Sequence, residues 1–245
     1  MQNKKVLLLI FYLLSIEAYS QEFEWAKQIG GLNAQVTEAI ITDSTGNVYT
    51  AGWFRGTVDF DPGPGIFNLS CSPELGTDIL ENDIFISKLD AEGNFVWAKK
   101  ISGDGYQGAH ALALDAEQNI YVTGRFSHTV DFDPGPGTFN ITSSYNDFSE
   151  AFIANMFLLK LDYAGSFVWA FNVSGISMGN LFGQQIVLDE EANIYVAGYF
   201  SETSDFDPGP DIALLEKGGI WDVFVAKYNT DGNYLWAKKL GGTGG

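Results

Sequence analysis

The residues with the clearest potential for chemistry are paired aspartates in a proline- and glycine-rich motif that the chain contains three times. Asp-Phe-Asp-Pro-Gly-Pro-Gly stands at residues 59–65 and 131–137, and it returns at 205–211 with aspartate in place of the last glycine. In an extended Asp-Phe-Asp segment, alternation places both carboxylates on one face and the phenylalanine on the other. The candidate metal ligands are therefore Asp59, Asp61, Asp131, Asp133, Asp205 and Asp207.

Two interpretations of this motif are open. Carboxylates held close together favour a hard cation with oxygen ligands, such as Ca²⁺, and the following turn could add backbone carbonyl oxygens. Alternatively the motif is a rigid turn, in which proline fixes φ, glycine permits positive φ, and the aspartates accept hydrogen bonds from backbone amides. The rigid turn is favoured, because Asp-x-Asp alone supplies fewer ligands than the roughly six to eight that Ca²⁺ takes. A site needed once is also seldom built into every repeat.

Tryptophans form a second group of candidates, because an indole ring offers a flat amphipathic face to a ligand. Four of them, each followed by alanine, occupy a fixed place in the repeat, which indicates packing between repeats: Trp25, Trp97, Trp169 and Trp236. Trp53 and Trp221 break the repeat, because Arg125 and Tyr199 correspond to Trp53 while asparagines correspond to Trp221. Trp53 and Trp221 are therefore the candidates for a ligand surface.

Sequence motifs of catalysis are absent. The two histidines, His110 and His128, occupy non-equivalent places in the repeat, and there is no nucleophile elbow, phosphate-binding loop, HExxH or CxxC pattern. We therefore expect no catalysis. The rival hypothesis is an extracellular hydrolase or lyase acting on polysaccharide, but such an enzyme should concentrate acids or histidines in one repeat, and here the acids recur in all three.

The elements that must position these residues are short runs rich in β-branched and aromatic residues, separated by turn residues. Each repeat holds four such runs: residues 39–43, 47–54, 83–90 and 94–101, then 111–115, 119–126, 154–162 and 166–173, then 185–189, 193–200, 222–229 and 233–240. Several are apolar on both faces, which is typical of sheets covered on both sides. Antiparallel four-stranded units repeated in this way predict an all-β fold of propeller blades, with the aspartate motif between the second and third strands.

The repeat resembles a known family. Gly-Asn-Val-Tyr-Thr-Ala-Gly at residues 46–52, Asp-Ile-Phe-Ile-Ser-Lys-Leu at 83–89 and Gly-Asn-Phe-Val-Trp-Ala at 93–98 resemble the SBBP β-propeller repeat of secreted bacterial proteins. The resemblance covers essentially the whole of residues 21–245, with blades at approximately 30–101, 102–173 and 174–240. It implies a multi-bladed propeller at or outside the cell surface, and it implies a scaffold with no defined activity.

The N-terminal segment and the composition indicate where the protein is located and which classes of partner are disfavoured. Residues 1–20 combine a short basic start, an apolar run and small residues before a cleavage point, which predicts a secretory signal peptide. We therefore expect a secreted, extracellular or cell-surface protein, with the periplasm as an alternative. No later segment reaches the ~20 apolar residues of a spanning helix, and a formal net charge of −18 disfavours nucleic acid as a partner.

The number of blades predicts an open arc. Residues 22–29, with Trp25, read as a lone fourth strand, yet the third repeat already has its own fourth strand at 233–240. Three full blades are also fewer than the typically 4–8 of closed propellers. We therefore expect an incomplete propeller whose partners include further blades of a longer chain, and which binds a protein or glycan ligand.

Overall fold

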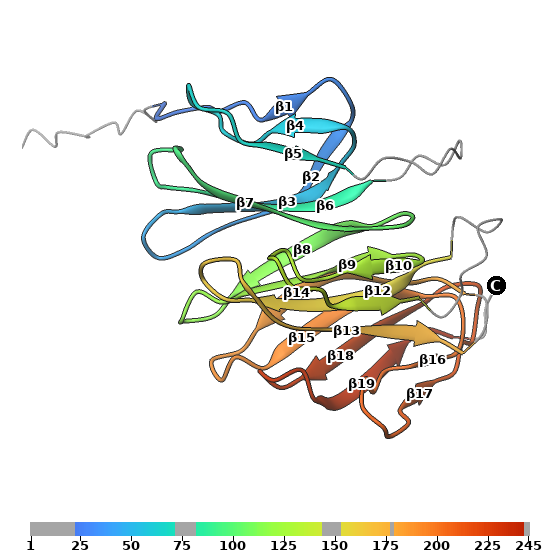
Figure 1. Ribbon diagram of the computed structural model, residues 1–245. Coiled ribbons are helices and arrows are strands. Elements are labelled where there is room, and N and C mark those ends of the chain that lie inside the picture. The colour runs from blue at the N-terminus through green and yellow to red at the C-terminus, as the bar shows by residue number, and fades with distance from the viewer. Residues whose placement is uncertain (1–22, 72–81, 144–152, 177–178, 243–245) are drawn as a thin grey trace, which may run out of the picture.

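The computed structural model describes residues 23–71, 82–143, 153–176 and 179–242, and every regular element in these ranges is a β-strand. The strands form successive layers that follow the order of the chain (Figure 1). No helix of the described part is long and apolar enough to cross a membrane. The predicted signal peptide at residues 1–20 lies outside the described residues.

Three sheets correspond to the three repeats, and each contains four antiparallel strands in chain order. Blade 1 is made of β2 (Gln35–Thr42), β3 (Val48–Phe54), β6 (Asp83–Leu89) and β7 (Phe95–Gly103); blade 2 of β8 (Gly108–Leu114), β9 (Ile120–Phe126), β12 (Asn155–Leu161) and β13 (Phe167–Gly175); blade 3 of β14 (Leu181–Leu188), β15 (Ile194–Phe200), β18 (Asp222–Tyr228) and β19 (Tyr234–Leu240). The predicted all-β fold of four-stranded propeller blades is confirmed, and the sheets form an open arc.

The first strand of every blade begins earlier than the sequence predicts, because it contains a β-bulge. The pairing register shifts between Thr37 and Ala39, and it shifts at the same place in β8 and β14. The residues left unpaired are Glu38, His110 and Gln184. A bulge interrupts the apolar alternation, so the sequence pattern identified only the half of each strand that follows it.

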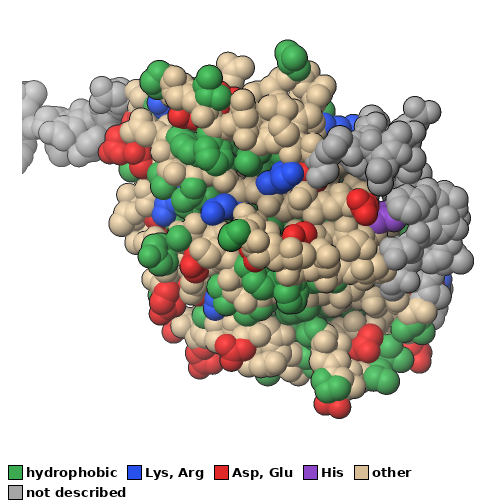
Figure 2. Space-filling model, in the orientation of Figure 1, with side chains coloured by type: hydrophobic (Ala, Val, Ile, Leu, Met, Phe, Trp, Pro, Cys, Tyr) green, Lys and Arg blue, Asp and Glu red, His purple; other side chains and the backbone are tan. Residues whose placement is uncertain are grey.

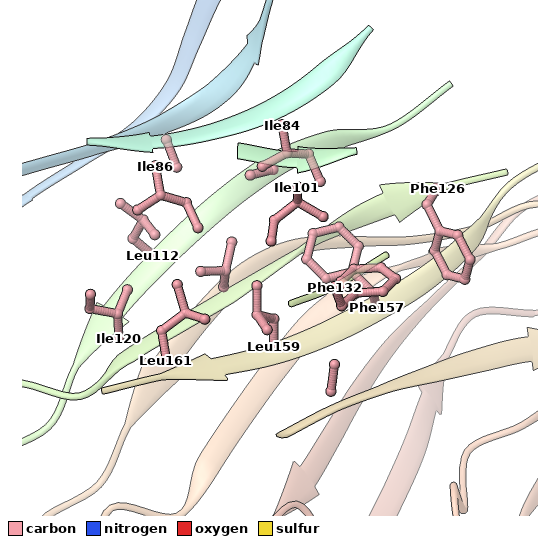
Figure 3. Close-up of a cluster of buried hydrophobic side chains, with 14 of the residues drawn as sticks. Ile84, Ile86, Ile101, Leu112, Ile120, Phe126, Phe132, Phe157, Leu159 and Leu161 are labelled. Carbon is pink, nitrogen blue, oxygen red and sulfur yellow. The ribbon is translucent and has the colours of Figure 1, made fainter. Parts of the chain in front are cut away.

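The blades pack face to face through apolar side chains. Ile84, Ile86 and Ile101 of blade 1 face Leu112 and Leu159 of blade 2, and all lie in one buried cluster (Figure 3). The repeated tryptophans lie at the same boundaries: the Trp97 ring is 6.2 Å from Tyr49 in its own blade, and a Cβ added to Gly165 in the turn of blade 2 would lie 3.4 Å from it. Trp97 therefore contacts both blades.

Acidic residues stabilise the turns between strands. Asp43 accepts hydrogen bonds from the amides of Thr45 and Asn47, at 2.9 and 3.0 Å, and Asn47 adds a side-chain bond of 2.8 Å. Burial acts to raise the pKa of Asp43, but these hydrogen bonds outweigh it and lower the pKa to about 2. Asp115 and Asp189 accept equivalent bonds in the other blades. Part of the strong acidity of the chain is thus explained by turn formation.

The aspartate motifs lie in hairpins, and the second and third of these pair with the preceding blade. These hairpins, here called straps, are β4 (Thr57–Asp59) with β5 (Asn68–Ser70), β10 (Thr129–Asp131) with β11 (Asn140–Thr142), and β16 (Ser204–Asp205) with β17 (Leu214–Leu215). Strand β10 pairs with β7 of blade 1, and β16 pairs with β13 of blade 2. The sheets of blades 1 and 2 therefore contain six strands rather than the four predicted.

The phenylalanine of each motif fastens its strap to its own blade. Phe132 is fully buried, and its ring centroid is 5.3 Å from Phe126 and 5.1 Å from Phe157. Phe60 and Phe206 make the same contacts in blades 1 and 3. The straps of blades 2 and 3 therefore each join two blades, because the phenylalanine packs in one blade and the strap backbone pairs with the preceding one.

The prediction of a strand over residues 22–29 is wrong for the described part of that range. Residues 23–29 have no strand pairing, and only β1 (Gly30–Gly31) pairs, with β4 of the first strap. The sequence has the pattern of a fourth strand, but a fourth strand needs a third strand beside it. No described strand lies in that place.

Candidate ligand-binding face

Residues that differ from repeat to repeat lie together at one end of the blades. The first strands β2, β8 and β14 are neighbours in space. Each begins at the end of the blade where the second strand finishes, because Gln35 pairs with Phe54 and Leu181 with Phe200. The straps leave from this same end. Trp53 therefore lies one blade away from its counterpart Arg125, and Arg125 lies one blade away from Tyr199.

Arg125 stands in the middle of a row of aromatic rings. Its guanidinium carbon is 5.0 Å from the centroid of Tyr106 and 5.2 Å from that of Phe182, so a ring from blade 2 and a ring from blade 3 flank the cation. Its Nε is buried and makes no hydrogen bond within the described ranges. A guanidinium flanked by two aromatic faces is a cation suited to an anionic group.

The row extends to both neighbouring blades. Phe182 stacks on Trp221 at 5.9 Å and meets Tyr199 at 5.0 Å, and Trp221 itself is half-exposed. On the other side, Arg55 lies over Trp53 at 5.3 Å. Trp53 in turn approaches Gly108, where an added Cβ would be 3.5 Å from its Cδ1 atom. We call the seven residues Trp53, Arg55, Tyr106, Arg125, Phe182, Tyr199 and Trp221 the aromatic–arginine row.

The two tryptophans that break the repeat thus lie at the same end of the blades, joined by residues that the repeat pattern does not single out. In that pattern Arg125 is only the counterpart of Trp53. A usable signal was present, since Arg55 and Arg125 are the only arginines in the chain. What linked them to the tryptophans is the adjacency of blades, which the sequence pattern does not give.

The bulges place polar side chains beside the row. His110 Nδ1 lies 2.9 Å from the carbonyl oxygen of Gly183, and the Gln184 side-chain amide is 3.1 Å from the same nitrogen. Burial is the largest effect on the pKa of His110 and lowers it; the hydrogen bond with Gly183 opposes burial, and the charge of Arg125 adds a smaller lowering effect. The Gly183 oxygen only accepts and the Gln184 amide nitrogen only donates, so Nδ1 forms one of these two hydrogen bonds, according to the tautomer of the ring.

The six motif aspartates make the hydrogen bonds of a turn. Asp131 Oδ1 accepts from the amides of Asp133 and Phe139, at 3.1 and 2.7 Å, and Asp133 Oδ1 accepts from Gly135 at 2.7 Å. The other two copies repeat this arrangement. Within the described ranges no three His, Cys, Asp or Glu side chains are grouped as a metal ion would require. These contacts favour the rigid turn, and calcium binding stays a prediction to be tested.

Calcium titration separates the two interpretations. We expect no change in melting temperature when calcium is added to chelator-treated protein, because the motif oxygens already accept backbone amides. The Asp133→Asn variant, which keeps the Oδ1 acceptor for Gly135, should melt at nearly the same temperature. If calcium instead raises the melting temperature and Asp133→Asn removes the effect, the loop is a metal site, since saturation at ~100 Kd adds about 2.7 kcal/mol.

Comparison with known proteins agrees with the architecture. Residues 24–53 match a family model described as SBBP, a β-propeller repeat. The chain is also 30% identical over 246 residues to a WD repeat-containing protein, L264, of Acanthamoeba polyphaga mimivirus. That similarity covers 90% of this chain and 17% of the viral protein. Both matches are to repeats that form propeller blades.

Proposed function

We propose that this chain, a β-propeller-repeat protein, is an exported scaffold that binds a protein or glycan ligand through the aromatic–arginine row and carries out no reaction on it. Propellers host many unrelated functions, so the proposal has to rest on the site rather than on the fold. The signal-peptide pattern of residues 1–20 supports secretion or display at the cell surface, with the periplasm as the alternative compartment.

One observation carries the proposal: the row consists of residues that the repeat does not need. Side chains that hold blades together recur at equivalent places, as Phe60, Phe132 and Phe206 do. Trp53, Arg125 and Trp221 differ in type from the residues at the equivalent places of the other blades, yet they lie along one end of three adjacent blades. Aromatic faces bind sugar rings or apolar side chains, and a guanidinium binds carboxylates. The row therefore suits a ligand that combines rings with negative charge.

The hydrolase alternative has less support. Glycoside hydrolysis uses two carboxyl groups on either side of the scissile bond. Near the row, β2 supplies Glu38, whereas the motif aspartates are engaged by the amides of their own turns. Degradation of a polysaccharide by the purified protein would contradict a pure binding role.

An array of neutral and acidic glycans, together with candidate surface proteins, tests the proposal. We expect binding of ligands that carry carboxylates, and a loss of about tenfold in affinity for Trp221→Ala, equivalent to about 1.4 kcal/mol. Tyr163→Ala is the matched control, because Tyr163 is an exposed aromatic residue in the turn at the other end of blade 2. Equal effects of the two substitutions, or binding indifferent to both, would place the ligand elsewhere.

A further inference from the structure

Blade 2, which has a described blade on either side, lacks a side chain at one place beside the aromatic–arginine row. The residue opposite Arg125 in the pairing of β8 with β9 is Gly108, and opposite residues of an antiparallel pair share one face of the sheet. At the equivalent place blade 1 has Val36 and blade 3 has Phe182. The glycine therefore leaves room beside Arg125 that the neighbouring blades fill with an apolar side chain.

The ring of His110 reaches this place. A Cβ added to Gly108 would lie 3.9 Å from His110 Nε2 and 3.5 Å from Trp53 Cδ1. Nδ1 makes its hydrogen bond to β14 of blade 3, whereas Nε2 makes none within the described residues. The half-buried imidazole is thus oriented by one nitrogen and turns the other toward Gly108, beside Trp53 and Arg125.

Two charged groups face His110 in the described part of the chain. Strand β9 brings Arg125 and β2 brings Glu38, whereas β14 contributes only the uncharged Gly183 carbonyl and Gln184 amide. Burial and the charge of Arg125 oppose protonation of the imidazole, and its pKa is lowered, although the bond with Gly183 and the charge of Glu38 act the other way. An anion bound next to both Arg125 and His110 would favour protonation, because it attracts the charged ring.

The row is a local exception in the charge of the molecule. Acidic side chains are spread over the face shown in Figure 2, in keeping with the formal net charge of −18. Such a surface repels an anionic ligand, so binding depends on positive charge placed at the site. Both arginines of the chain belong to the row, and a protonated His110 adds a positive charge next to them.

We propose that His110 is a second anion-binding side chain of the row, and that a carboxylate carried on a sugar ring is held between Arg125 and His110 with the ring against Trp53. This inference rests on the proposed function, because it specifies the ligand of the same row. In the protonated imidazole both nitrogens carry a hydrogen, so Nδ1 donates to the Gly183 oxygen and Nε2 donates to the carboxylate. Binding therefore strengthens as the pH falls through the pKa of His110, as long as the carboxylate stays ionised.

A uronic acid fits these contacts better than an acidic side chain of a protein. Its carboxylate is attached directly to a rigid ring, so the ring can stack on the indole of Trp53 while the carboxylate reaches the guanidinium. A glutamate or aspartate side chain supplies the charge but no ring, and it has to be ordered on binding. The mixture of aromatic and cationic groups thus favours an acidic glycan.

Calorimetric titration of the full chain with a glucuronate oligosaccharide tests the proposal. We expect the affinity to be about fivefold to tenfold higher at pH 5 than at pH 7.5, as for one added charge-assisted hydrogen bond. His110→Gln should remove this difference, and it controls for the general loss of negative charge at pH 5, which both proteins share. The carboxyl-reduced oligosaccharide has the same rings without the charge, and its binding should not depend on pH.

Nuclear magnetic resonance of the imidazoles tests the contact in the unaltered protein. The chain has two histidines, and the signal missing from His110→Gln identifies His110. Saturating glucuronate oligosaccharide should raise the pKa of His110 and leave that of His128 unchanged.

The outcomes separate this inference from the proposed function. Binding of the oligosaccharide that does not depend on pH, with the pKa of His110 unchanged, overturns the role of His110 and leaves the binding row intact. An oligo-glutamate peptide that binds more tightly than the oligosaccharide overturns the sugar as ligand. Failure of both oligosaccharides to bind at either pH overturns the inference, and the array with Trp221→Ala then decides the proposed function separately.

Discussion

Replacing Phe132 by alanine should lower the free energy of unfolding by about 3–5 kcal/mol, the range for truncating a buried phenylalanine. Phe132 is fully buried, and its ring lies 5.3 and 5.1 Å from Phe126 and Phe157. It also belongs to the cluster that contains Ile101 of blade 1. The substitution therefore leaves a cavity at the boundary of two blades and releases the strap that joins them. Urea denaturation followed by tryptophan fluorescence measures the change.

The matched control is Phe139→Ala in the same strap. Phe139 is exposed and contacts only the partly buried Phe167 among the aromatic rings of the described residues, at 4.7 Å. We expect this variant to lose no more than about 1 kcal/mol. Similar losses for Phe132→Ala and Phe139→Ala would show that the strap is not anchored through its buried phenylalanine.

Replacing Gly124 by alanine should lower the free energy of unfolding by about 1–3 kcal/mol, as overpacking does. A Cβ at Gly124 would lie 2.0 Å from the carbonyl oxygen of Gly108 and 3.0 Å from the Cα of Ala109, and these are backbone atoms of the bulged strand. The bulge would have to open, so His110 would move and ligand binding at the neighbouring Arg125 should weaken as well.

Gly108→Ala is the control for that substitution. A Cβ at Gly108 meets its nearest neighbour, Trp53 Cδ1, at 3.5 Å, which is an ordinary contact. Thermal unfolding should therefore change little for Gly108→Ala and clearly for Gly124→Ala. An unchanged melting temperature for Gly124→Ala would show that the glycine opposite the bulge is not required.

The sequence by itself determined the unit of the fold. Runs such as Ile84-Phe85-Ile86 are apolar on both faces, and this pattern predicted sheets covered on both sides, as found in β6, where every residue is buried. Turn residues between the runs, and their recurrence, predicted four antiparallel strands per blade. These features are local, because alternation and turn formation depend on residues within a few positions of one another.

The tertiary structure decided how the units are joined. Val130 pairs with Gly103 of the preceding blade, and no local pattern distinguishes that partner from any other strand edge. The bulge at His110 was also hidden, since it breaks the alternation that reveals a strand.

The candidate site was likewise determined in part by the sequence and in part by the tertiary structure. Trp53 and Trp221 stood out in the sequence because they interrupt the repeat, but Arg125 and Phe182, which lie between them, did not. Phe182 and Arg125 come from different blades and meet at 5.2 Å only because β14 packs beside β8. A sequence shows which residues differ from the repeat pattern. Whether two such residues from different repeats touch each other depends on how the blade faces pack.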